Sequence, residues 1–309
     1  MTPFLIDTDP GIDDALALLF AWNSPEIRVE AITTVAGNVS LDAASTNLLR
    51  LLALRRPDPR PVVAAGAAGP LARALTTATR YHGEDGLGDL PDWPAVGRLP
   101  RSPDAVAVIL EAARRHRGDL TIVALGPLTN LALALKADAA VVGRVGRIVA
   151  MGGAIDVPGN VTPTAEFNMS VDPEAAHRVL AAGLPLEIVP LDATRQAVLP
   201  RAGMRATLAR GPGPLASRIQ GFSERGFRIA HSDGAQGMAL HDPLAVGLAV
   251  DPSLGKWEAV RLAIGPDGET LRTSGPPNCR VAKVVESDRF IRLFLDRLCP
   301  ATRPHGTSS

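Results

Sequence analysis

Apolar and polar positions alternate along the chain in two distinct patterns. Short apolar runs, typical of buried strands, take turns with longer stretches in which apolar residues recur every three or four positions, typical of helices. This alternation predicts an α/β fold with a mostly parallel central sheet flanked by helices. The predicted strands are residues 4–6, 28–35, 61–64, 119–125, 147–151 and 186–190, and the predicted helices are residues 15–22, 41–55, 128–136, 172–182 and 204–210.

The pattern changes near the C-terminus, where three short apolar runs predict a small antiparallel extension of the sheet before a final helix. Two segments rich in glycine, proline and polar residues, 76–103 and 211–214, are predicted loops. The chain shows no internal repeat, so we expect one domain over residues 1–300 and a disordered polar tail over residues 301–309. The strands of the extension are residues 257–264, 269–273 and 280–285, and the final helix is residues 288–298.

Composition adds that the chain is rich in apolar residues and electrically balanced. Of its 309 residues, 46% are hydrophobic, enough for a substantial core. Lys plus Arg equals Asp plus Glu at 32 each, which argues against a general attraction to nucleic acid or to an anionic membrane. The two cysteines, Cys279 and Cys299, argue against a disulfide framework and for a reducing compartment. With no signal peptide and no apolar run of membrane-spanning length, we expect a cytoplasmic protein.

The densest candidate chemistry lies near the N-terminus, where four aspartates fall within eight positions: Asp7, Asp9, Asp13 and Asp14. They surround a Pro-Gly turn after an apolar strand, and ligands bind at the carboxyl ends of strands in open α/β sheets. Carboxylates this close repel one another unless a cation or shared protons relieve them. With no His or Cys nearby, the cluster favours Ca²⁺ or Mg²⁺. Helix capping accounts for Asp13 or Asp14 but not for all four.

Two further segments carry polar residues that suit ligand binding. Asn160, Glu166 and Asn168 cluster in a polar loop after a predicted strand and suit hydrogen bonding to a polyhydroxylated ligand, although an ordinary Asx-turn loop fits the same residues. His241 and Asp242 open an apolar stretch, where Asp before Pro is typical of a helix cap. A histidine at that place also suits a proton donor near neutral pH.

Together these segments resemble the nucleoside hydrolases, calcium-dependent enzymes that cleave the N-glycosidic bond of ribonucleosides. The resemblance covers almost the whole chain and implies a fold of Rossmann-like topology. The matching motifs, in the order of the family, are residues 7–15 (DTDPGIDDA), 31–38 (AITTVAGN), 126–130 (GPLTN), 151–153 (MGG), 166–168 (EFN) and 241–243 (HDP).

The resemblance implies that Asp9, Asp14 and Asp242 bind Ca²⁺ through their carboxylates and that Leu125 adds its backbone carbonyl. The ion would hold the ribose 2′- and 3′-hydroxyls and one water, and Asp9 would accept the proton of this water as general base. Attack at C1′ would pass through an oxocarbenium-like state, as in inverting glycoside hydrolysis. Asp7 would orient the metal ligands from behind.

The resemblance also implies a substrate pocket. His241 would lie on the side of the leaving base and assist its protonation, and His82 would approach the base from a flexible flap, residues 81–88. The polar contacts to the sugar would favour ribose over 2-deoxyribose, because a site built for a hydroxyl leaves its partners unpaired when the hydroxyl is missing. The residues implied to contact the sugar or line its pocket are Asp13, Asn38, Met151, Asn160, Glu166, Phe167 and Asn168.

The base preference does not follow from the resemblance. Some family members place a tyrosine and an arginine against the base, and the positions that we align with them, counting back from His241, are Ile229 and Asp233. Phe222 and Phe227 suit either stacking on a base or the core of a helix. Purine, pyrimidine and mixed specificity stay open, with a lean towards pyrimidine or broad ribonucleoside hydrolysis.

Two alternatives come from other classes of protein. An Asp-x-Asp motif after an N-terminal strand also opens the haloacid-dehalogenase-like phosphatases, but there the Asp13 and Asp14 pair would have no role. A calcium-dependent ribose-binding protein without catalysis would be expected to have lost Asp9, Asp14, Asp242 or His241, which are all present. The main prediction is a ribonucleoside hydrolase that forms a homodimer or homotetramer, as the resemblance implies.

Overall fold

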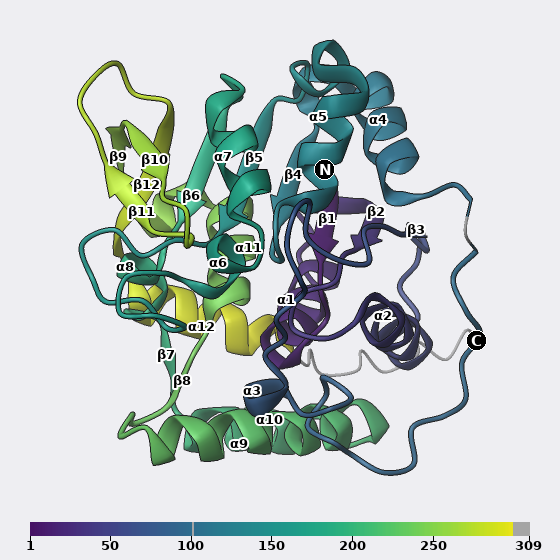
Figure 1. Ribbon diagram of the computed structural model, residues 1–309. Coiled ribbons are helices and arrows are strands. Elements are labelled where there is room, and N and C mark those ends of the chain that lie inside the picture. Colours follow the sequence, from purple (N-terminus) through teal and green to yellow (C-terminus); the bar gives the residue numbers. More distant parts are fainter. Residues whose placement is uncertain (101, 299–309) are drawn as a thin grey trace.

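A central sheet of eight strands organises the computed structural model, which describes residues 1–100 and 102–298 (Figure 1). The strand order is β3-β2-β1-β4-β5-β6-β12-β9, and each neighbouring pair is parallel except the antiparallel pair β12 and β9. The first six strands follow the order of the Rossmann fold. The strands are β1 (Thr2–Thr8), β2 (Ile27–Thr34), β3 (Val62–Ala65), β4 (Thr121–Ala124), β5 (Arg147–Met151), β6 (Leu186–Val189), β9 (Gly255–Val260) and β12 (Cys279–Val285).

Helices cover both faces of this sheet. The longer ones are α1 (Ile12–Trp22), α2 (Leu41–Arg55), α4 (Ala105–His116), α5 (Thr129–Val142), α7 (Pro173–Ala181), α9 (Arg201–Arg210), α10 (Pro214–Ser232), α11 (His241–Val250) and α12 (Ser287–Leu298). Short helices are α3 (Thr79–His82), α6 (Phe167–Val171) and α8 (Leu191–Thr194), and short 3-10 turns are η1 (Arg117–Asp119) and η2 (Pro252–Leu254). Two small antiparallel pairs complete the fold, β7 (Val198–Leu199) with β8 (Met238–Ala239) and β10 (Leu262–Ile264) with β11 (Thr270–Arg272).

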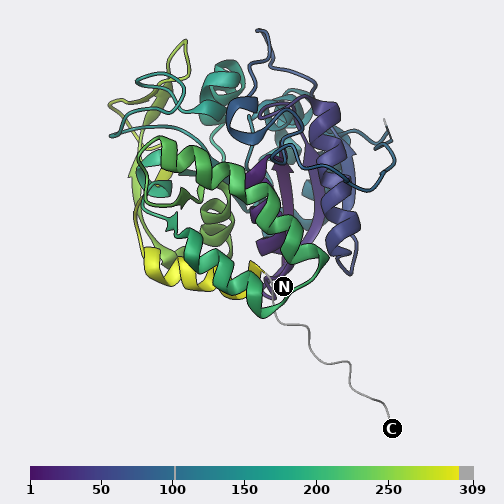
Figure 2. The ribbon, with the colours of Figure 1, turned by 90° about the horizontal axis from the view of Figure 1, so that it is seen from below.

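The side chains of the central strands enter two hydrophobic cores, one on each face of the sheet. Phe4 and Ile6 of β1 belong to the core under α1, α2, α10, α11 and α12, whereas Leu5 belongs to the core under α4, α5 and α7. This follows from the period of two in a strand, which sends successive side chains to opposite faces. Figure 1 shows α4 and α5 on the opposite side of the sheet from α1 and α12, and Figure 2 shows α9 and α10 on the outside of the α1 layer.

Helix α1 is buried from its first turn to its last. Every residue from 12 to 21 is buried, because the helix lies between the sheet and the outer helices α10, α11 and α12. A helix enclosed in this way must be apolar on all sides, and its sequence is apolar apart from Asp13 and Asp14. The two aspartates therefore occupy a fixed place at the N-terminal end of α1.

The structure confirms the predicted α/β class, the parallel sheet and most of the predicted elements, with some corrections. The run 257–264 is not one strand but two, because Val260 is paired with Cys279 at the start of β12, and the chain beyond Arg261 pairs with β11 instead. The predicted loop 76–103 contains α3, and the helices α4 and α10 were not predicted. Helix α4 begins where the Asp104 side chain accepts a hydrogen bond from the Ala107 amide at 2.9 Å.

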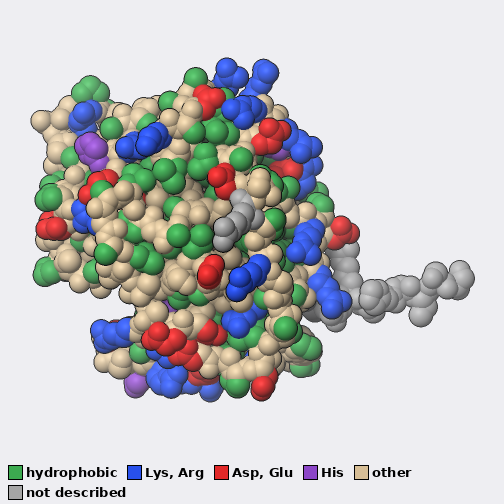
Figure 3. All heavy atoms as spheres, turned by 45° about the vertical axis from the view of Figure 1, so that its right-hand side comes forward, with side chains coloured by type: hydrophobic (Ala, Val, Ile, Leu, Met, Phe, Trp, Pro, Cys, Tyr) green, Lys and Arg blue, Asp and Glu red, His purple; other side chains and the backbone are tan. Residues whose placement is uncertain are grey.

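The remaining predictions concern surface charge, membrane-spanning helices, the cysteines and the C-terminal tail. On the face shown in Figure 3, cationic and anionic side chains are interspersed. None of the helices in the described ranges has both the length and the apolar character needed to cross a membrane. Cys279 is a buried free thiol, whereas Cys299 and the predicted tail 301–309 lie outside the described residues.

Candidate active site

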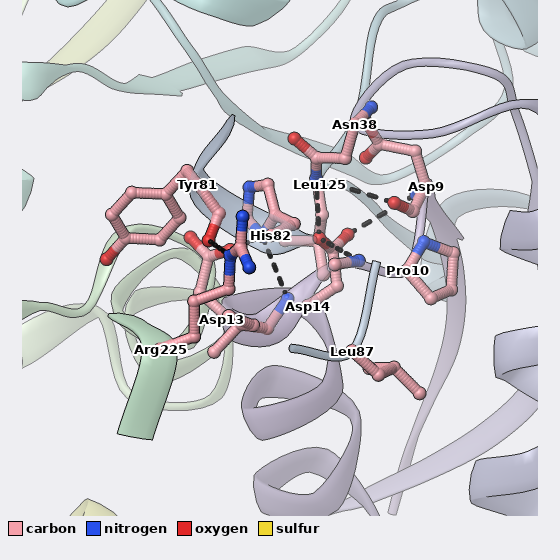
Figure 4. Close-up of polar contacts among 12 residues, drawn as sticks. Asp9, Pro10, Asp13, Asp14, Asn38, Tyr81, His82, Leu87, Leu125 and Arg225 are labelled. Carbon is pink, nitrogen blue, oxygen red and sulfur yellow. Dashed lines mark hydrogen bonds and ion pairs between the residues drawn. The ribbon is translucent and has the colours of Figure 1, made fainter. Parts of the chain in front are cut away.

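The candidate site lies at the carboxyl ends of β1, β2 and β4, where the strand order reverses direction along the chain. This switch point is the place at which open α/β sheets bind ligands. Asp9 follows β1, Asn38 follows β2 and Leu125 follows β4 (Figure 4). The Asn38 amide donates to Asp9 Oδ2 at 2.6 Å, and the Leu125 amide donates to the Asp7 carbonyl at 2.7 Å. Adjacent strand ends thus hold the N-terminal aspartate motif in place.

Three carboxylates gather at the base of the site. One oxygen from each of Asp13, Asp14 and Asp242 lies within 4.8 Å of the others, and all three residues are buried. Asp14 is held most firmly, because its oxygens accept hydrogen bonds from the Thr8 hydroxyl at 2.5 Å, the Gly11 amide at 2.9 Å and the Asn38 side-chain amide at 2.9 Å. Asp242 reaches this cluster from the first turn of α11.

The carboxylates at this site repel one another, and a cation or bound protons would relieve the repulsion. Burial and then the charge of Asp14 raise the pKa of Asp9 well above its usual value, and the same causes raise that of Asp13 to about 7. Burial and then the charge of Asp13 raise the pKa of Asp242. Among the described residues, no Lys or Arg forms an ion pair with these carboxylates. The candidate metal ligands are all carboxylate oxygens, which suit a hard divalent ion. Calcium in particular binds several carboxylate oxygens at once.

Asp9, which was predicted as a metal ligand, is not one of the three residues whose carboxylate oxygens gather, and its side chain lies in a slot between Gly37 and Gly126. Its side chain is fully buried, and its Oδ1 has no hydrogen-bond partner among the described residues. A Cβ added at Gly37 would lie 2.1 Å from Asp9 Oδ2, and one added at Gly126 would lie 2.5 Å from Oδ1. Glycine at both positions is therefore what admits the carboxylate. One oxygen of Asp9 is thereby held against glycine backbone without a hydrogen-bond partner among the described residues.

Asp7 does not line the pocket, and its side chain is hydrogen-bonded to none of the predicted metal ligands. Its Oδ1 accepts hydrogen bonds from the Thr33 hydroxyl at 2.5 Å and the Asn130 side-chain amide at 2.7 Å. Asn130 also donates to the Thr34 carbonyl at 3.0 Å. Burial raises the pKa of Asp7 to about 6. These contacts join the ends of β1 and β2 to the start of α5, behind the carboxylate cluster.

A pocket of about 400 Å³ opens above the cluster. Asp9 and Asp14 have no exposed surface and are not among its lining residues. The structure brings all the other predicted site residues to the walls of this one pocket, although they come from distant parts of the chain. They are Asp13, Asn38, His82, Leu125, Met151, Asn160, Glu166, Phe167, Asn168, His241 and Asp242.

The polar loop around Glu166 forms one rigid wall. Glu166 caps α6, and its carboxylate accepts hydrogen bonds from the backbone amides of Gly153 at 2.9 Å, of Asn168 at 2.9 Å and of Met169 at 3.1 Å. The Asn168 side-chain amide donates to the Leu125 carbonyl at 2.6 Å. The residues predicted to grip a sugar thus also hold their own loop and join it to the end of β4.

Two histidines, His82 and His241, also line the pocket. His82 accepts a hydrogen bond at Nδ1 from the Ile12 amide at 3.0 Å, so its proton is on Nε2. His241 Nδ1 lies 2.7 Å from the Thr194 hydroxyl. Burial is the main cause that lowers the pKa of both rings to about 4. Both histidines are therefore neutral at pH 7 and act as hydrogen-bonding groups rather than as cations.

Several residues in or beside the pocket are not predicted by the sequence, or the sequence leaves their role undecided. Ile229 and Asp233, placed by counting back from His241, both line the pocket. Phe222 and Phe227 are buried in the core packed on α10, which supports the second of their two interpretations. Thr194 had no signal in the sequence, because its importance comes from a contact with a residue far along the chain. The remaining lining residues are Thr76, Thr77, Ala78, Arg80, Tyr81 and Val161.

A buried aspartate cluster thus adjoins a polar pocket at the switch point of a Rossmann-like sheet, where proteins of this fold class bind small ligands. The model of the family described as inosine-uridine preferring nucleoside hydrolase matches residues 4–292. The chain belongs to this family and is a ribonucleoside hydrolase, an N-glycosyl hydrolase. Membership in the family disfavours both the phosphatase and the non-catalytic binding protein.

Relatives of known name cover nearly the whole chain. A pyrimidine-specific ribonucleoside hydrolase RihA from Shewanella sp. (strain MR-4) is 37% identical over 97% of both chains. Its counterpart from Salmonella schwarzengrund is 38% identical over 96% of this chain and 98% of the relative. Among solved structures, a purine-preferring ribonucleoside hydrolase from Gardnerella vaginalis is similar with a TM-score of 0.91 and 29% identity over 96% and 98% of the two chains. A plant nucleoside hydrolase has a TM-score of 0.90 and 34% identity over 97% and 99%.

Proposed function

We propose that this chain is a calcium-dependent hydrolase of pyrimidine ribonucleosides that releases free base and ribose. The observation that carries the proposal is the convergence of an uncompensated carboxylate cluster and a polar pocket at one end of the sheet. The curated relatives with 37% and 38% identity are pyrimidine-specific, which supports this base class. The purine-preferring structure is less similar, at 29% identity.

Calcium would be held by Asp9, Asp14 and Asp242, together with the Leu125 carbonyl. When bound, the ion would balance the buried carboxylates, hold the sugar hydroxyls and lower the pKa of the attacking water. Asp9 Oδ1 has no hydrogen-bond partner among the described residues, so this oxygen would accept the proton of the water. The fixed orientation of Asp14 suits a metal ligand, because its carboxylate cannot rotate away without losing its hydrogen bonds.

The sugar would lie between the carboxylate cluster and the Glu166 wall. Asp13, Asn160, Glu166 and Asn168 present polar atoms there, and Met151 supplies an apolar surface. Asp13, Glu166 and Asn168 are buried, so they would lose hydrogen-bond partners with a 2-deoxyribonucleoside, and discrimination of this kind reaches about 10⁴-fold or more in sites built around a hydroxyl. We therefore expect ribonucleosides to be strongly preferred.

The base would leave on the side of His241 and His82. His82 carries its proton on Nε2, and a hydroxyl that donates to His241 Nδ1 would place the proton of that ring on Nε2 as well. Each neutral ring would then offer one N–H donor to the departing base. Hydrogen bonds of this type stabilise the negative charge that develops on the base as the glycosidic bond breaks.

The test is a reducing-sugar assay with uridine, cytidine, inosine and adenosine, each with and without prior removal of calcium. We expect faster release from uridine and cytidine, loss of release after chelation, and recovery when calcium is returned. 2′-Deoxyuridine serves as the matched control and should release little sugar. Equal release with and without calcium would refute the metal assignment, and faster release from the purine nucleosides would refute the pyrimidine assignment.

Further proposals concern the molecule in the cell. We propose a homodimer or homotetramer of one-domain subunits, as the family resemblance implies, and light scattering coupled to gel filtration measures this directly. A cytoplasmic location is supported by the scarcity of cysteine, with two residues in the chain. Fractionation of the source cells tests it, and recovery from the secreted fraction would refute it.

A further inference from the structure

A single arginine on α10 binds the segment that forms one wall of the pocket. We name this segment, residues 79–89, the α3 loop. Arg225 Nε donates to the Tyr81 carbonyl at 3.2 Å, and Nη2 donates to the carbonyls of Thr79 at 3.2 Å and Arg80 at 3.0 Å. Its Nη1 forms an ion pair with Asp89 Oδ2 at 2.9 Å. Figure 4 shows the Arg225 side chain directed at Tyr81 beside His82. One guanidinium therefore contacts both ends of the loop.

The need for such a contact follows from the shortness of α3. This helix has four residues, and a helix of that length leaves most of its carbonyls without partners inside the helix. The planar guanidinium offers five donors in a fixed fork, which suits three neighbouring carbonyls better than a lysine would. The loop also packs along α10, since a Cβ at Gly88 would lie 3.0 Å from the Phe222 carbonyl.

The α3 loop matters because it carries residues of the pocket. Arg80, Tyr81 and His82 all line the pocket, and His82 is joined through Nδ1 to the amide of Ile12 at the start of α1. The loop is thus attached to the carboxylate end of the site through His82, to α2 through Asp85, whose carbonyl accepts a hydrogen bond from the Asn47 side chain at 2.7 Å, and to α10 through Arg225. Arg225 is outside the described pocket lining, so it acts on a substrate through the loop.

We propose that Arg225 is a positioning residue that holds the α3 loop over the pocket before substrate binds, so that Tyr81 and His82 are already in place. Without Arg225 the loop would spend part of its time away from the pocket, and substrate would bind the closed fraction alone. The apparent dissociation constant rises as that fraction falls. The kinetic test of this inference rests on the proposed function, because it measures KM for uridine.

The same helix offers a matched control. Arg218 of α10 also donates to two backbone carbonyls, those of Pro91 at 2.8 Å and Asp92 at 2.6 Å, but these residues are not among those that line the pocket. We expect Arg225→Ala to raise KM for uridine by about 5- to 30-fold, equivalent to the loss of one or two net hydrogen bonds, with a smaller change in kcat. Arg218→Ala should change KM less than about twofold. Equal changes in the two variants would overturn the proposal.

Two further measurements separate positioning from general stability. In a double-mutant cycle, Arg225→Ala should have a much smaller effect on KM when His82 is already alanine, because the two residues act through one loop. Additive effects would contradict the proposal. Arg225→Lys keeps the charge for Asp89 but lacks the fork, so it should fall between the wild type and Arg225→Ala.

A readout that does not need turnover distinguishes failure of this inference from failure of the proposed function. Amide hydrogen exchange should speed up over residues 79–89 in Arg225→Ala and stay unchanged there in Arg218→Ala. If no ribonucleoside is hydrolysed but exchange behaves in this way, the proposed function fails and the role of Arg225 stands. Unchanged exchange in the loop of Arg225→Ala would overturn that role.

Discussion

At the scale of the residue, the chemistry of this site depends on what each buried polar atom contacts. Asp14 accepts several hydrogen bonds and is fixed, whereas Asp9 keeps one buried oxygen without a partner. The two residues are close in sequence and identical in type, so their local pattern does not separate their roles. The contacts made after folding distinguish them, and the proposed roles of Asp14 as a fixed ligand and of Asp9 as the base follow from that difference.

The role of Asp9 is tested by Asp9→Asn. The amide keeps the size of the side chain and an acceptor for the Asn38 amide, but it does not accept a proton from water. We expect kcat to fall by about 10²- to 10⁴-fold, the usual range for a general base. Thermal unfolding of the calcium-free protein should not shift downwards, because a neutral amide removes repulsion from a buried cluster. Retention of more than a few per cent of activity would contradict the assignment.

The contact between Thr194 and His241 predicts a dependence on the leaving group. Thr194→Val removes the hydroxyl and keeps the shape, so the His241 ring loses its only hydrogen-bond partner among the described residues. We expect about a 10-fold loss of kcat on uridine and a smaller loss on a nitrophenyl riboside, whose leaving group needs less help. Thr194→Ser should restore most of the activity, and equal losses on both substrates would argue against the role.

At the scale of the element, the site depends on three neighbouring strand ends that approach closely. Gly37 after β2 and Gly126 after β4 lie against the Asp9 carboxylate, which follows β1. The sequence shows glycines in these motifs but not what they face. The strand order β2-β1-β4 explains why glycine is needed at both positions, because it places Gly37 and Gly126 on the two sides of the Asp9 carboxylate.

Gly126→Ala should therefore damage the site without changing any polar side chain. The new Cβ would lie 2.5 Å from Asp9 Oδ1 and 2.9 Å from a Val35 methyl, so Asp9 must move. We expect about a 10-fold or greater loss of kcat and a destabilisation of about 1–3 kcal/mol, the usual cost of overpacking. Gly69→Ala is the control, since nothing lies within 4 Å of its Cβ. Wild-type kcat in Gly126→Ala would show that the slot is not required.

At the scale of the whole molecule, the carboxylate cluster joins segments from opposite ends of the chain. Asp13 and Asp14 begin α1, and Asp242 belongs to the first turn of α11, which packs against α1. An ion bound by these residues would therefore stabilise the contact between two central helices as well as serve the reaction. An ion that binds the folded state alone stabilises it by mass action.

Calcium should consequently raise the unfolding temperature of the chelated protein. A calcium concentration 100 times the dissociation constant would contribute about 2.7 kcal/mol. Magnesium should contribute less, because it requires a tighter octahedral geometry and keeps more of its waters. In Asp242→Asn the calcium-dependent shift should shrink, as measured by differential scanning calorimetry. An unfolding temperature that does not respond to calcium would refute the metal site.

The local pattern by itself determined the α/β class, most strands and helices, and the motifs whose residues later met in one pocket. Periodicity and turn signals are properties of neighbouring residues, so they can be recognised without the rest of the chain. The tertiary structure decided the strand order, the different surroundings of Asp9 and Asp14, the pairing of Thr194 with His241 and the contact of Arg225 with the α3 loop. These features join residues far apart in sequence, and their contacts exist only after the sheet and its helices have packed.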